Sequence, residues 1–183
     1  MDALSDNSLM LKVKAGNLDL MGLLFERYHK PLFGFLYHTT GQVAHSEDLV
    51  QTVFYRMLKY RHTFSGEGEF RTWMYHLARN VVIDAHRKNS KTSYQYDMAS
   101  VMENMGVSPD AEAKIEREQQ NEMLQRALQL LSIEHREVLV LSRFQELSYK
   151  EIAEILKTSE GNIKIKVHRA MKELKEIFLK ISE

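Results

Sequence analysis

The sequence predicts an all-α protein made of two small helical domains joined by a flexible linker, and three observations carry this prediction. The 183 residues include only 8 Gly and 2 Pro, too few turn-forming residues for a barrel or sandwich of short strands. Apolar residues recur at helical spacing along most of the chain. Near the C-terminus, a short helix with a strong start signal, a tight break and a basic helix form the pattern of a helix-turn-helix.

Composition narrows the possible functions. The chain has no Cys, which excludes disulfides, zinc–thiolate sites and iron–sulfur clusters. It has neither a glycine-rich phosphate loop nor His residues at metal-ligand spacing. Its longest aliphatic runs fall far short of the roughly 18 residues that span a bilayer, and its N-terminus lacks the features of a signal peptide. We therefore expect a cytoplasmic protein that needs no cofactor or metal, inserts into no membrane and is not an enzyme.

The first domain is predicted over residues 1–88. Residues 9–44 carry apolar side chains at helical spacing. Ser46, which precedes two acidic residues, predicts the start of a helix that runs to about Tyr60. One face of this helix is apolar, and the other holds Asp48, Gln51, Thr52 and Tyr55. Such a polar face can dock a protein partner, although simple exposure to solvent is the more common reason for one.

Residues 61–69 contain two Gly and predict a loop, after which a second long helix covers about 70–88. This helix joins aromatic residues to cations: Phe70, Trp73, Tyr75, Arg79, Arg87 and Lys88. Single-stranded DNA needs this combination, because bases stack on the rings while the backbone follows the positive charge. Composition alone favours the alternative, in which the aromatic rings belong to the core.

A linker is predicted over residues 89–113, which lack periodicity and are rich in Ser and acidic residues. A structureless stretch of this length is uncommon inside one compact domain, so it indicates a domain boundary. The net charge of the chain changes sign within this linker. Residues 76–91 hold four cations and one acid, whereas residues 92–134 hold three cations and eight acids.

The second domain is predicted over residues 114–183. Its helical pattern resumes near Ala111, and Ser148 with Glu151 forms a capping box for a helix over 149–156. A second helix follows over 160–178. Its inner face is apolar, and its other faces hold Asn162, Lys164, Ile165, Lys166, His168, Arg169 and Lys172. The second helix of a helix-turn-helix enters the major groove with cations on its outer face. The alternative is a helical hairpin with a solvated basic face.

Several stretches resemble conserved regions of bacterial RNA polymerase sigma factors. They are residues 46–54, 70–80, 147–156, 161–164 and 168–170. The first resembles the acidic Asp-Leu-Val-Gln signature of the second conserved region, and the next resembles its aromatic promoter-melting segment. The remainder resemble the helix-turn-helix of the fourth region. Order, spacing and length are similar to the small two-domain extracytoplasmic-function (ECF) group over residues 9–180.

The resemblance implies binding to core RNA polymerase and to a two-part promoter. Core polymerase would contact Asp48, Gln51, Thr52 and Tyr55. The minus-10 element, read as single-stranded DNA, would contact Phe64, Ser65, Trp73, Tyr75, Arg79, Asn80, Arg87 and Lys88. The duplex minus-35 element would contact Asn162, Lys164, Ile165, Lys166, His168, Arg169 and Lys172. An anti-sigma factor is a further implied partner, and the acidic linker would follow the RNA exit path.

The sequence departs from the family pattern at a few positions. Ser132 stands where proline is frequent, and residues 157–158 replace the usual glycine of the turn. Ile165 and Lys166 replace a Ser-Arg pair, and Thr52 stands where acidic residues are common. The rival hypothesis is a stand-alone helix-turn-helix regulator whose N-terminal half dimerises or senses a ligand. A helical enzyme is a distant third.

Overall fold

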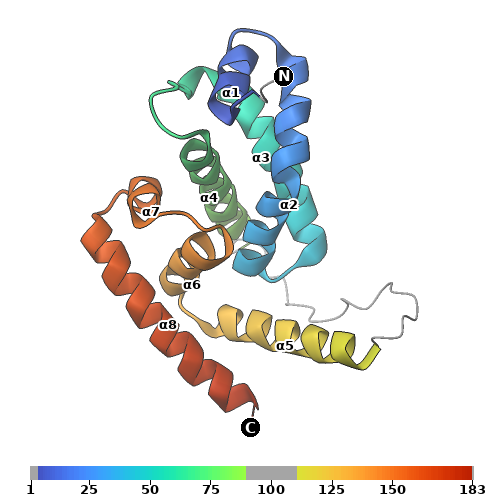
Figure 1. The fold of residues 1–183 in the computed structure, drawn as a ribbon, viewed down its shortest axis with the longest axis vertical. Helices are drawn as coiled ribbons and strands as arrows, with labels where there is room; N and C mark the ends of the chain where they lie inside the picture. The colour runs from blue at the N-terminus through green and yellow to red at the C-terminus, as the bar shows by residue number, and fades with distance from the viewer. Residues whose placement is uncertain (1–3, 90–110, 183) are drawn as a thin grey trace.

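The computed structural model describes residues 4–89 and 111–182, and over these ranges it is helical without strands (Figure 1). Most of the predicted linker, residues 90–110, lies outside the described residues. The N-terminal half contains α1 (Asp6–Lys14), α2 (Met21–Thr40), α3 (Val43–Lys59) and α4 (Phe70–Asn89), with 3-10 turns at Leu18–Leu20 and Arg61–Thr63. The C-terminal half contains α5 (Ala111–Leu130), α6 (Ile133–Leu139), the π-helical turn η3 (Val140–Phe144), α7 (Tyr149–Leu156) and α8 (Glu160–Ser182). The predicted all-α fold with a C-terminal helix-turn-helix is confirmed.

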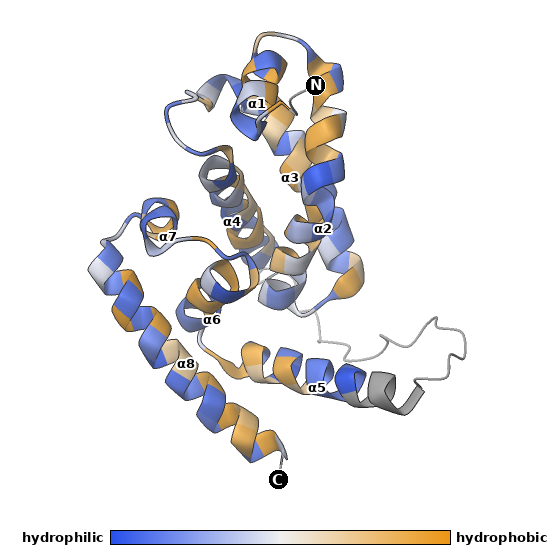
Figure 2. Ribbon diagram, in the orientation of Figure 1, coloured by the Kyte–Doolittle hydropathy of each residue, from blue (hydrophilic) through white to orange (hydrophobic). Residues whose placement is uncertain are grey.

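The N-terminal half is a bundle of α2, α3 and α4 with α1 packed across one end (Figure 1). Each helix is amphipathic, so hydrophobic and hydrophilic stretches alternate along the ribbons (Figure 2). Large apolar side chains meet at its centre; they include Leu9, Leu24, Phe35, Leu36, Met57, Phe70 and Met74. The shared core holds α3 and α4 side by side. The predicted polymerase-binding face of α3 and the predicted DNA-binding helix α4 therefore belong to the same bundle.

The start of α3 corrects one prediction. The helix begins at Val43, three residues before the expected cap at Ser46. Ser46 is fully buried, where its Oγ donates to the Gln42 carbonyl oxygen at 2.5 Å and shares a 3.0 Å hydrogen bond with Thr40 Oγ1. The hydroxyl therefore joins the end of α2 to the start of α3 instead of capping a free helix terminus.

The helix start predicted at Ser148 in the C-terminal half is confirmed. The Ser148–Glu151 capping box is present, and α7 spans the predicted residues 149–156. Ser132 caps α6 by accepting a hydrogen bond from the His135 amide at 3.3 Å, which gives a function to the residue that replaces proline. Ser159 accepts from the Asn162 amide at 3.2 Å and so caps α8.

The two halves pack against each other instead of standing apart. One cluster of buried apolar side chains runs continuously from α1 in the N-terminal half to α8 in the C-terminal half. Helix α4 lies beside α7, and α2 lies beside α5 and η3 (Figure 1). Among the described residues, no helix combines the length and hydrophobicity needed to cross a bilayer.

Lys157, which ends α7, generates a stability prediction. Its backbone is left-handed, with φ 54°, at the position where the family pattern has glycine. A side chain costs about 1 kcal/mol in that conformation, and glycine avoids most of this cost. We expect Lys157→Gly to raise the free energy of unfolding by roughly 0.5–1 kcal/mol in urea titrations. Lys175→Gly, in the exposed interior of α8, should lower it by about 1 kcal/mol, and a loss at both positions would contradict the strain argument.

Candidate nucleic-acid interface

The predicted polar face of α3 is open to solvent. Asp48 and Gln51 are exposed, and the Tyr55 side chain is 63% exposed. Thr52 is half-buried, and its Oγ1 donates to the Asp48 carbonyl oxygen at 3.0 Å. The opposite face is buried as predicted and consists of Leu49, Val50, Val53 and Met57. The four polar-face residues carry no cation, and an exposed aromatic ring among short polar groups suits a protein partner better than DNA.

An aromatic cluster forms where the 61–69 loop meets α4. Phe64 is only 2% exposed, and its ring lies 6.2 Å from that of Phe70 and 5.4 Å from that of Trp73, centroid to centroid. The Trp73 indole Nε1 donates to Thr63 Oγ1 at 3.1 Å, which fixes the orientation of the ring. Ser65 is exposed beside this cluster. The cluster therefore holds the loop in a defined position at the start of α4.

A cavity of about 210 Å³ opens beside the aromatic cluster. Phe64, Ser65 and Trp73 line it from the N-terminal half, while Glu154 and Ile155 of α7 line it from the C-terminal half. Its walls also include Thr72, whose buried Oγ1 has no hydrogen-bond partner in the part of the chain that the structure describes. Asn80, expected with Phe64 and Ser65 to contact the minus-10 element, lies about two helical turns beyond Trp73 and does not line this cavity.

Further along α4, two of the predicted DNA-contacting residues face the C-terminal half. Tyr75 is 1% exposed, and its hydroxyl donates to Gln145 Oε1 at 2.6 Å. Burial raises the pKa of this phenol well above its usual range, so it remains a donor. Arg79 Nε donates to Glu137 Oε1 of α6 at 2.6 Å. Burial raises the pKa of Glu137 even though the Arg79 guanidinium opposes that shift.

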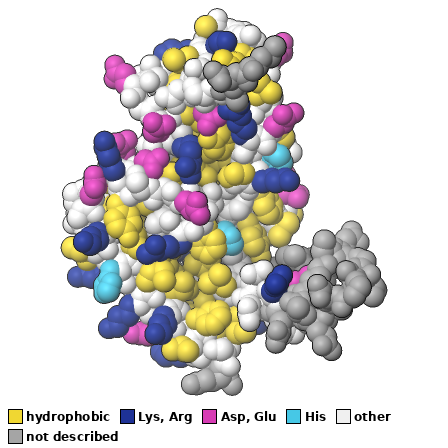
Figure 3. All heavy atoms as spheres, in the orientation of Figure 1, with side chains coloured by type: hydrophobic (Ala, Val, Ile, Leu, Met, Phe, Trp, Pro, Cys, Tyr) yellow, Lys and Arg dark blue, Asp and Glu magenta, His cyan; other side chains and the backbone are white. Residues whose placement is uncertain are grey.

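Most of the remaining predicted DNA contacts are exposed. Arg87 and Lys88 lie on the surface near the end of α4. On α8 the exposed residues are Asn162, Lys164, Ile165, His168, Arg169 and Lys172. Lys166 is half-buried and pairs with Glu134 of α6 at 2.8 Å, an interaction that also lowers the pKa of Glu134. Lys and Arg side chains gather along the edge formed by α8 (Figure 3). This basic edge, backed by α7, is the arrangement that a major-groove helix requires.

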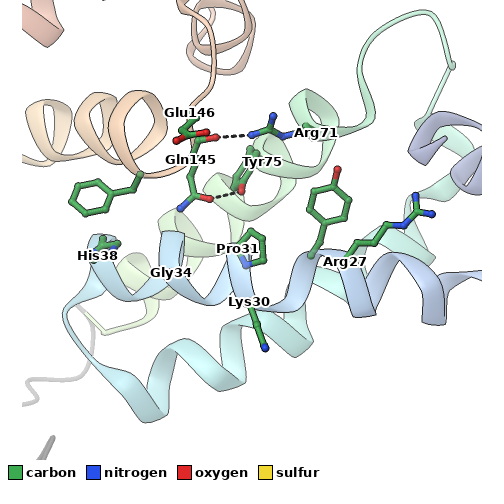
Figure 4. A pocket seen from close by; sticks show the side chains of 11 residues that line it. Arg27, Lys30, Pro31, Gly34, His38, Arg71, Tyr75, Gln145 and Glu146 are labelled. Atoms are coloured by element: carbon green, nitrogen blue, oxygen red, sulfur yellow. Dashed lines mark hydrogen bonds between the residues drawn. The ribbon is translucent and has the colours of Figure 1, made fainter. Parts of the chain in front are cut away.

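A second cavity, of about 570 Å³, lies at the junction of the halves between α2, α4 and the turn after η3 (Figure 4). Arg71 and Gln145 meet at its rim, where the Arg71 Nη2 donates to the Gln145 carbonyl oxygen at 2.5 Å. Its lining has three cations, Arg27, Lys30 and Arg71, and one acid, Glu146. No group of three or more metal-ligating side chains occurs among the described residues.

Residues at this junction were not identified from the sequence. The sequence assigns no role to Gln145 or Arg136, yet both side chains are more than nine-tenths buried. Arg71 was treated as part of a motif. Helical periodicity cannot identify such residues, because a polar side chain gives the same sequence pattern whether it contacts water or another helix.

Comparisons with known proteins identify the family. Residues 24–92 match the family model for sigma-70 region 2, and residues 121–174 match that for sigma-70 region 4. The chain is 32% identical over 164 residues to RNA polymerase sigma factor YlaC of Bacillus subtilis (strain 168), an alignment that covers 87% of this chain and 92% of that protein. It is also 32% identical over 160 residues to the ECF RNA polymerase sigma factor SigX of the same organism, covering 84% of this chain and 81% of that one. The chain belongs to the ECF group of RNA polymerase sigma factors.

A solved structure supports the fold of this sigma factor. The structure described as CnrH in complex with the cytosolic domain of CnrY has a TM-score of 0.72 and 21% identity, and the match covers 97% of this chain and 99% of that one. The two family models fall on opposite sides of residues 93–120, so the order of the predicted segments is the order of the family regions. Sigma factors are transcription initiation factors and not enzymes.

His38 gives the junction a pH dependence. Its Nδ1 lies 2.9 Å from Gln125 Oε1 of α5, and its ring centroid lies 4.1 Å from that of Phe144. Burial lowers the pKa of His38 below its ordinary 6.5, because the charged ring is poorly solvated there. The folded state therefore resists protonation. This contribution to stability is complete above pH 6.5 and is lost as the pH falls through the folded pKa.

We expect the melting temperature of the native protein to fall more steeply than that of His38→Asn between about pH 7.5 and pH 5.5. Asparagine keeps a donor toward Gln125 but does not titrate. Differential scanning calorimetry at matched ionic strength measures the difference. His62→Asn, at an exposed position in the 61–69 loop, serves as the control and should leave the native slope unchanged. Parallel pH slopes for the native protein and His38→Asn would remove His38 from this role.

Proposed function

We propose that this ECF sigma factor binds core RNA polymerase through the polar face of α3 and reads a two-part promoter with α4 and α8. The observation that carries the proposal is the pairing of an exposed α3 face that carries no cation with two separate basic segments, each inside a matched sigma region. The domain assignments follow: residues 1–88 bind polymerase and the minus-10 element, residues 114–183 bind the minus-35 element, and residues 89–113 connect them.

The polymerase surface is assigned to Asp48, Gln51, Thr52 and Tyr55. Tyr55 contributes the largest exposed apolar area of the four, and interfaces commonly gain most of their energy from a few such aromatic anchors. Thr52 contributes less, because its hydroxyl is already satisfied by the Asp48 carbonyl. The buried opposite face makes α3 a rigid support for this surface.

The minus-10 contacts are assigned to the aromatic cluster and to the α4 face that follows it. Phe64, Ser65 and Trp73 surround a cavity of about 210 Å³, large enough for an unstacked base. Extruding a base costs a few kcal/mol, which stacking and contacts to the base edge offset. Tyr75, Arg79, Asn80, Arg87 and Lys88 would follow the single strand along α4. Tyr75 and Arg79 become available only when the C-terminal half leaves them.

The minus-35 contacts are assigned to the outer face of α8. Lysines and Arg169 would hold the phosphates, which fix the register of the helix on the duplex without reading sequence. Asn162, Ile165 and His168 are exposed between them and would meet base edges. We further propose that the protein acts in the cytoplasm, without a cofactor or catalytic chemistry, and that an anti-sigma factor controls its access to polymerase.

Co-elution with core polymerase tests the proposal. The native protein should elute with core polymerase on gel filtration and direct run-off transcripts from a promoter library. Asp48→Ala combined with Tyr55→Ala should weaken core binding by at least about tenfold, because it removes the anchor ring and the charge beside it. Asp19→Ala, an exposed position outside α3, is the matched control and should bind normally. Tight binding to duplex DNA without core polymerase, and no co-elution, would favour the stand-alone regulator.

Ile165 gives a sharper test of the α8 assignment. Its side chain is 51% exposed, so it contributes little to stability, but against DNA it can contact a thymine methyl group. We expect Ile165→Ser to change the preferred minus-35 sequence, with a cost of about 1 kcal/mol at one base pair. The free energy of unfolding should change by less than about 0.5 kcal/mol. Lys164→Ala should instead weaken all sequences alike, and the same uniform loss in Ile165→Ser would refute base contact.

A further inference from the structure

Helix α1 lies against the backbone of the 61–69 loop. Asn7, Leu11 and Lys14 follow one another at intervals of four and three residues, so they form one stripe along the helix. Hydrogen bonds join the two ends of this stripe to residues 64–70, which come 50 to 63 positions later in the chain. In Figure 1, α1 lies beside the segment that leads from α3 to α4. The stripe and the loop are therefore neighbours in space although they are distant in sequence.

The Asn7 side chain forms two hydrogen bonds where the loop enters α4. Its Nδ2 donates to the Gly68 carbonyl oxygen at 2.9 Å, and its Oδ1 accepts from the Phe70 amide at 2.8 Å. The first amides of a helix have no partner inside the helix, so Asn7 caps α4 from a different helix. One side chain thus fixes both the last residues of the loop and the start of α4.

Lys14 and Leu11 hold the earlier part of the loop. Lys14 Nζ donates to the Phe64 carbonyl oxygen at 2.6 Å. Between the polar contacts, the Gly66 backbone packs directly on Leu11, since a Cβ at Gly66 would lie 3.1 Å from Leu11 Cδ2. The Gly66 backbone is also left-handed, with φ 83°. Glycine permits both this conformation and the close approach, so the loop backbone contacts the stripe at both ends and in the middle.

Helix α1 can support the loop because its other side is anchored in the bundle. Asp6 Oδ1, in the first turn of α1, accepts from Arg27 Nη1 of α2 at 2.6 Å. The fully buried residues of α1 are Leu9, Met10 and Val13. Movement of α1 relative to α2 would expose these apolar side chains and break the ion pair. The stripe is therefore a fixed surface.

The cavity proposed for the extruded base has one wall made by the loop and one made by α4. Phe64, Ser65 and Gly68 belong to the loop wall, and Thr72 and Trp73 belong to the α4 wall. Among the described residues that line the cavity, none belongs to α1. The helix holds its own wall, whereas the loop contains two glycines and has many accessible backbone conformations when unsupported. The distance between the walls therefore depends on α1.

We propose that α1 is a positioning element for base recognition, in which Asn7, Leu11 and Lys14 set the width of the minus-10 pocket by fixing the backbone of residues 64–70. The inference rests on the proposed minus-10 function of the loop and extends it to a helix that does not touch the base. A pocket selects among bases by stacking and by hydrogen bonds to the base edge, and both depend on the distance between its walls. Changes in the stripe should alter the base preference at minus-10 and leave core binding and the minus-35 preference intact.

The first test removes the cap that Asn7 provides. Holoenzyme formed with Asn7→Ala should be compared with native holoenzyme in run-off transcription from a library that varies every minus-10 base. The ratio between the preferred base and its nearest competitor should fall at least about fivefold at one position or more, because displacements of about 1 Å in a preorganised site cost up to about 100-fold. Asn17→Ala, at an exposed position beyond the end of α1, is the matched control and should keep the native ratios.

The second test removes the contact to the Phe64 carbonyl. Lys14→Met keeps the length of the side chain but loses the donor, and it should lower the base preference at least about threefold. Lys12→Met, at an exposed position on the same helix, makes the same change in charge and should weaken all minus-10 sequences alike, if it weakens any. Lys14→Arg restores a donor and should recover the native preference to within about twofold.

The third test observes the loop without a promoter. The chain has one Trp, Trp73, whose ring lies 5.4 Å from that of Phe64 and whose Nε1 donates to Thr63. Acrylamide quenching of its fluorescence in the full chain therefore reports how firmly the loop is held. Quenching should rise at least about 1.5-fold in Asn7→Ala and stay at the native value in Asn17→Ala, with unchanged far-ultraviolet circular dichroism in both.

The outcomes separate this inference from the proposed function. Native minus-10 ratios in both Asn7→Ala and Lys14→Met would overturn the role of α1. A loss of transcription that is equal for all minus-10 sequences would overturn it as well, because it would show a contribution to stability alone. Altered ratios with native Trp73 quenching would show that α1 does not act through the loop. A native holoenzyme without preference at any minus-10 position would instead refute the proposed function of the loop.

Discussion

The C-terminal end of helix α2 is the constraint on which the arrangement of the two halves depends. The Tyr37 carbonyl of its last turn accepts from the Gly41 amide at 2.8 Å as well as from Gln125, whereas burying the His38 and Thr39 carbonyls without donors from the C-terminal half would be costly. The amides of α5 and the guanidinium of Arg136 satisfy them. Arg136 in turn donates to the Leu128 and Gln129 carbonyls, so it sets the angle between α5 and α6. Once these contacts form, α6, η3 and α7 have one way to lie against α4.

The junction between the halves combines an apolar centre with hydrogen bonds at its margins. The apolar centre and the hydrogen bonds contribute differently to the association of the halves. Burial of the apolar cluster stabilises the association of the halves, since removing apolar surface from water is favourable. The polar bonds give the association a single geometry, because a hydrogen bond is strong only over a narrow range of distance and angle. Polar contacts also exchange readily with water and with nucleic acid. The two halves therefore pack in one defined arrangement, and their charged groups can return to water when the halves separate.

Much of the local structure was predictable, and the reasons for the failures are physical. The Ser148 capping box predicted the bounds of α7, because capping depends on residues a few positions apart. Ser46 was misread, since its hydroxyl bonds the end of α2 and no local pattern reports that contact. Tyr75 was expected to contact single-stranded DNA and is buried against Gln145, a residue 70 positions away. Family motifs supplied the order of the binding segments, but the pairing of the halves depends on contacts between distant residues.

The packing of the two halves depends on the π-helical turn at Val140–Phe144. Here the Gln145 amide bonds the Val140 carbonyl five residues back, at 3.0 Å, where an α-helix would use the residue four back. A π-turn of this kind arises from one inserted residue. Deleting one residue from the turn would restore α-helical phase and rotate all that follows by about 100°. Gln145 would then turn away from α4, and α7 would move with it. A single-codon insertion or deletion is therefore enough, in evolutionary terms, to gain or lose the contact between the halves while every other side chain stays the same.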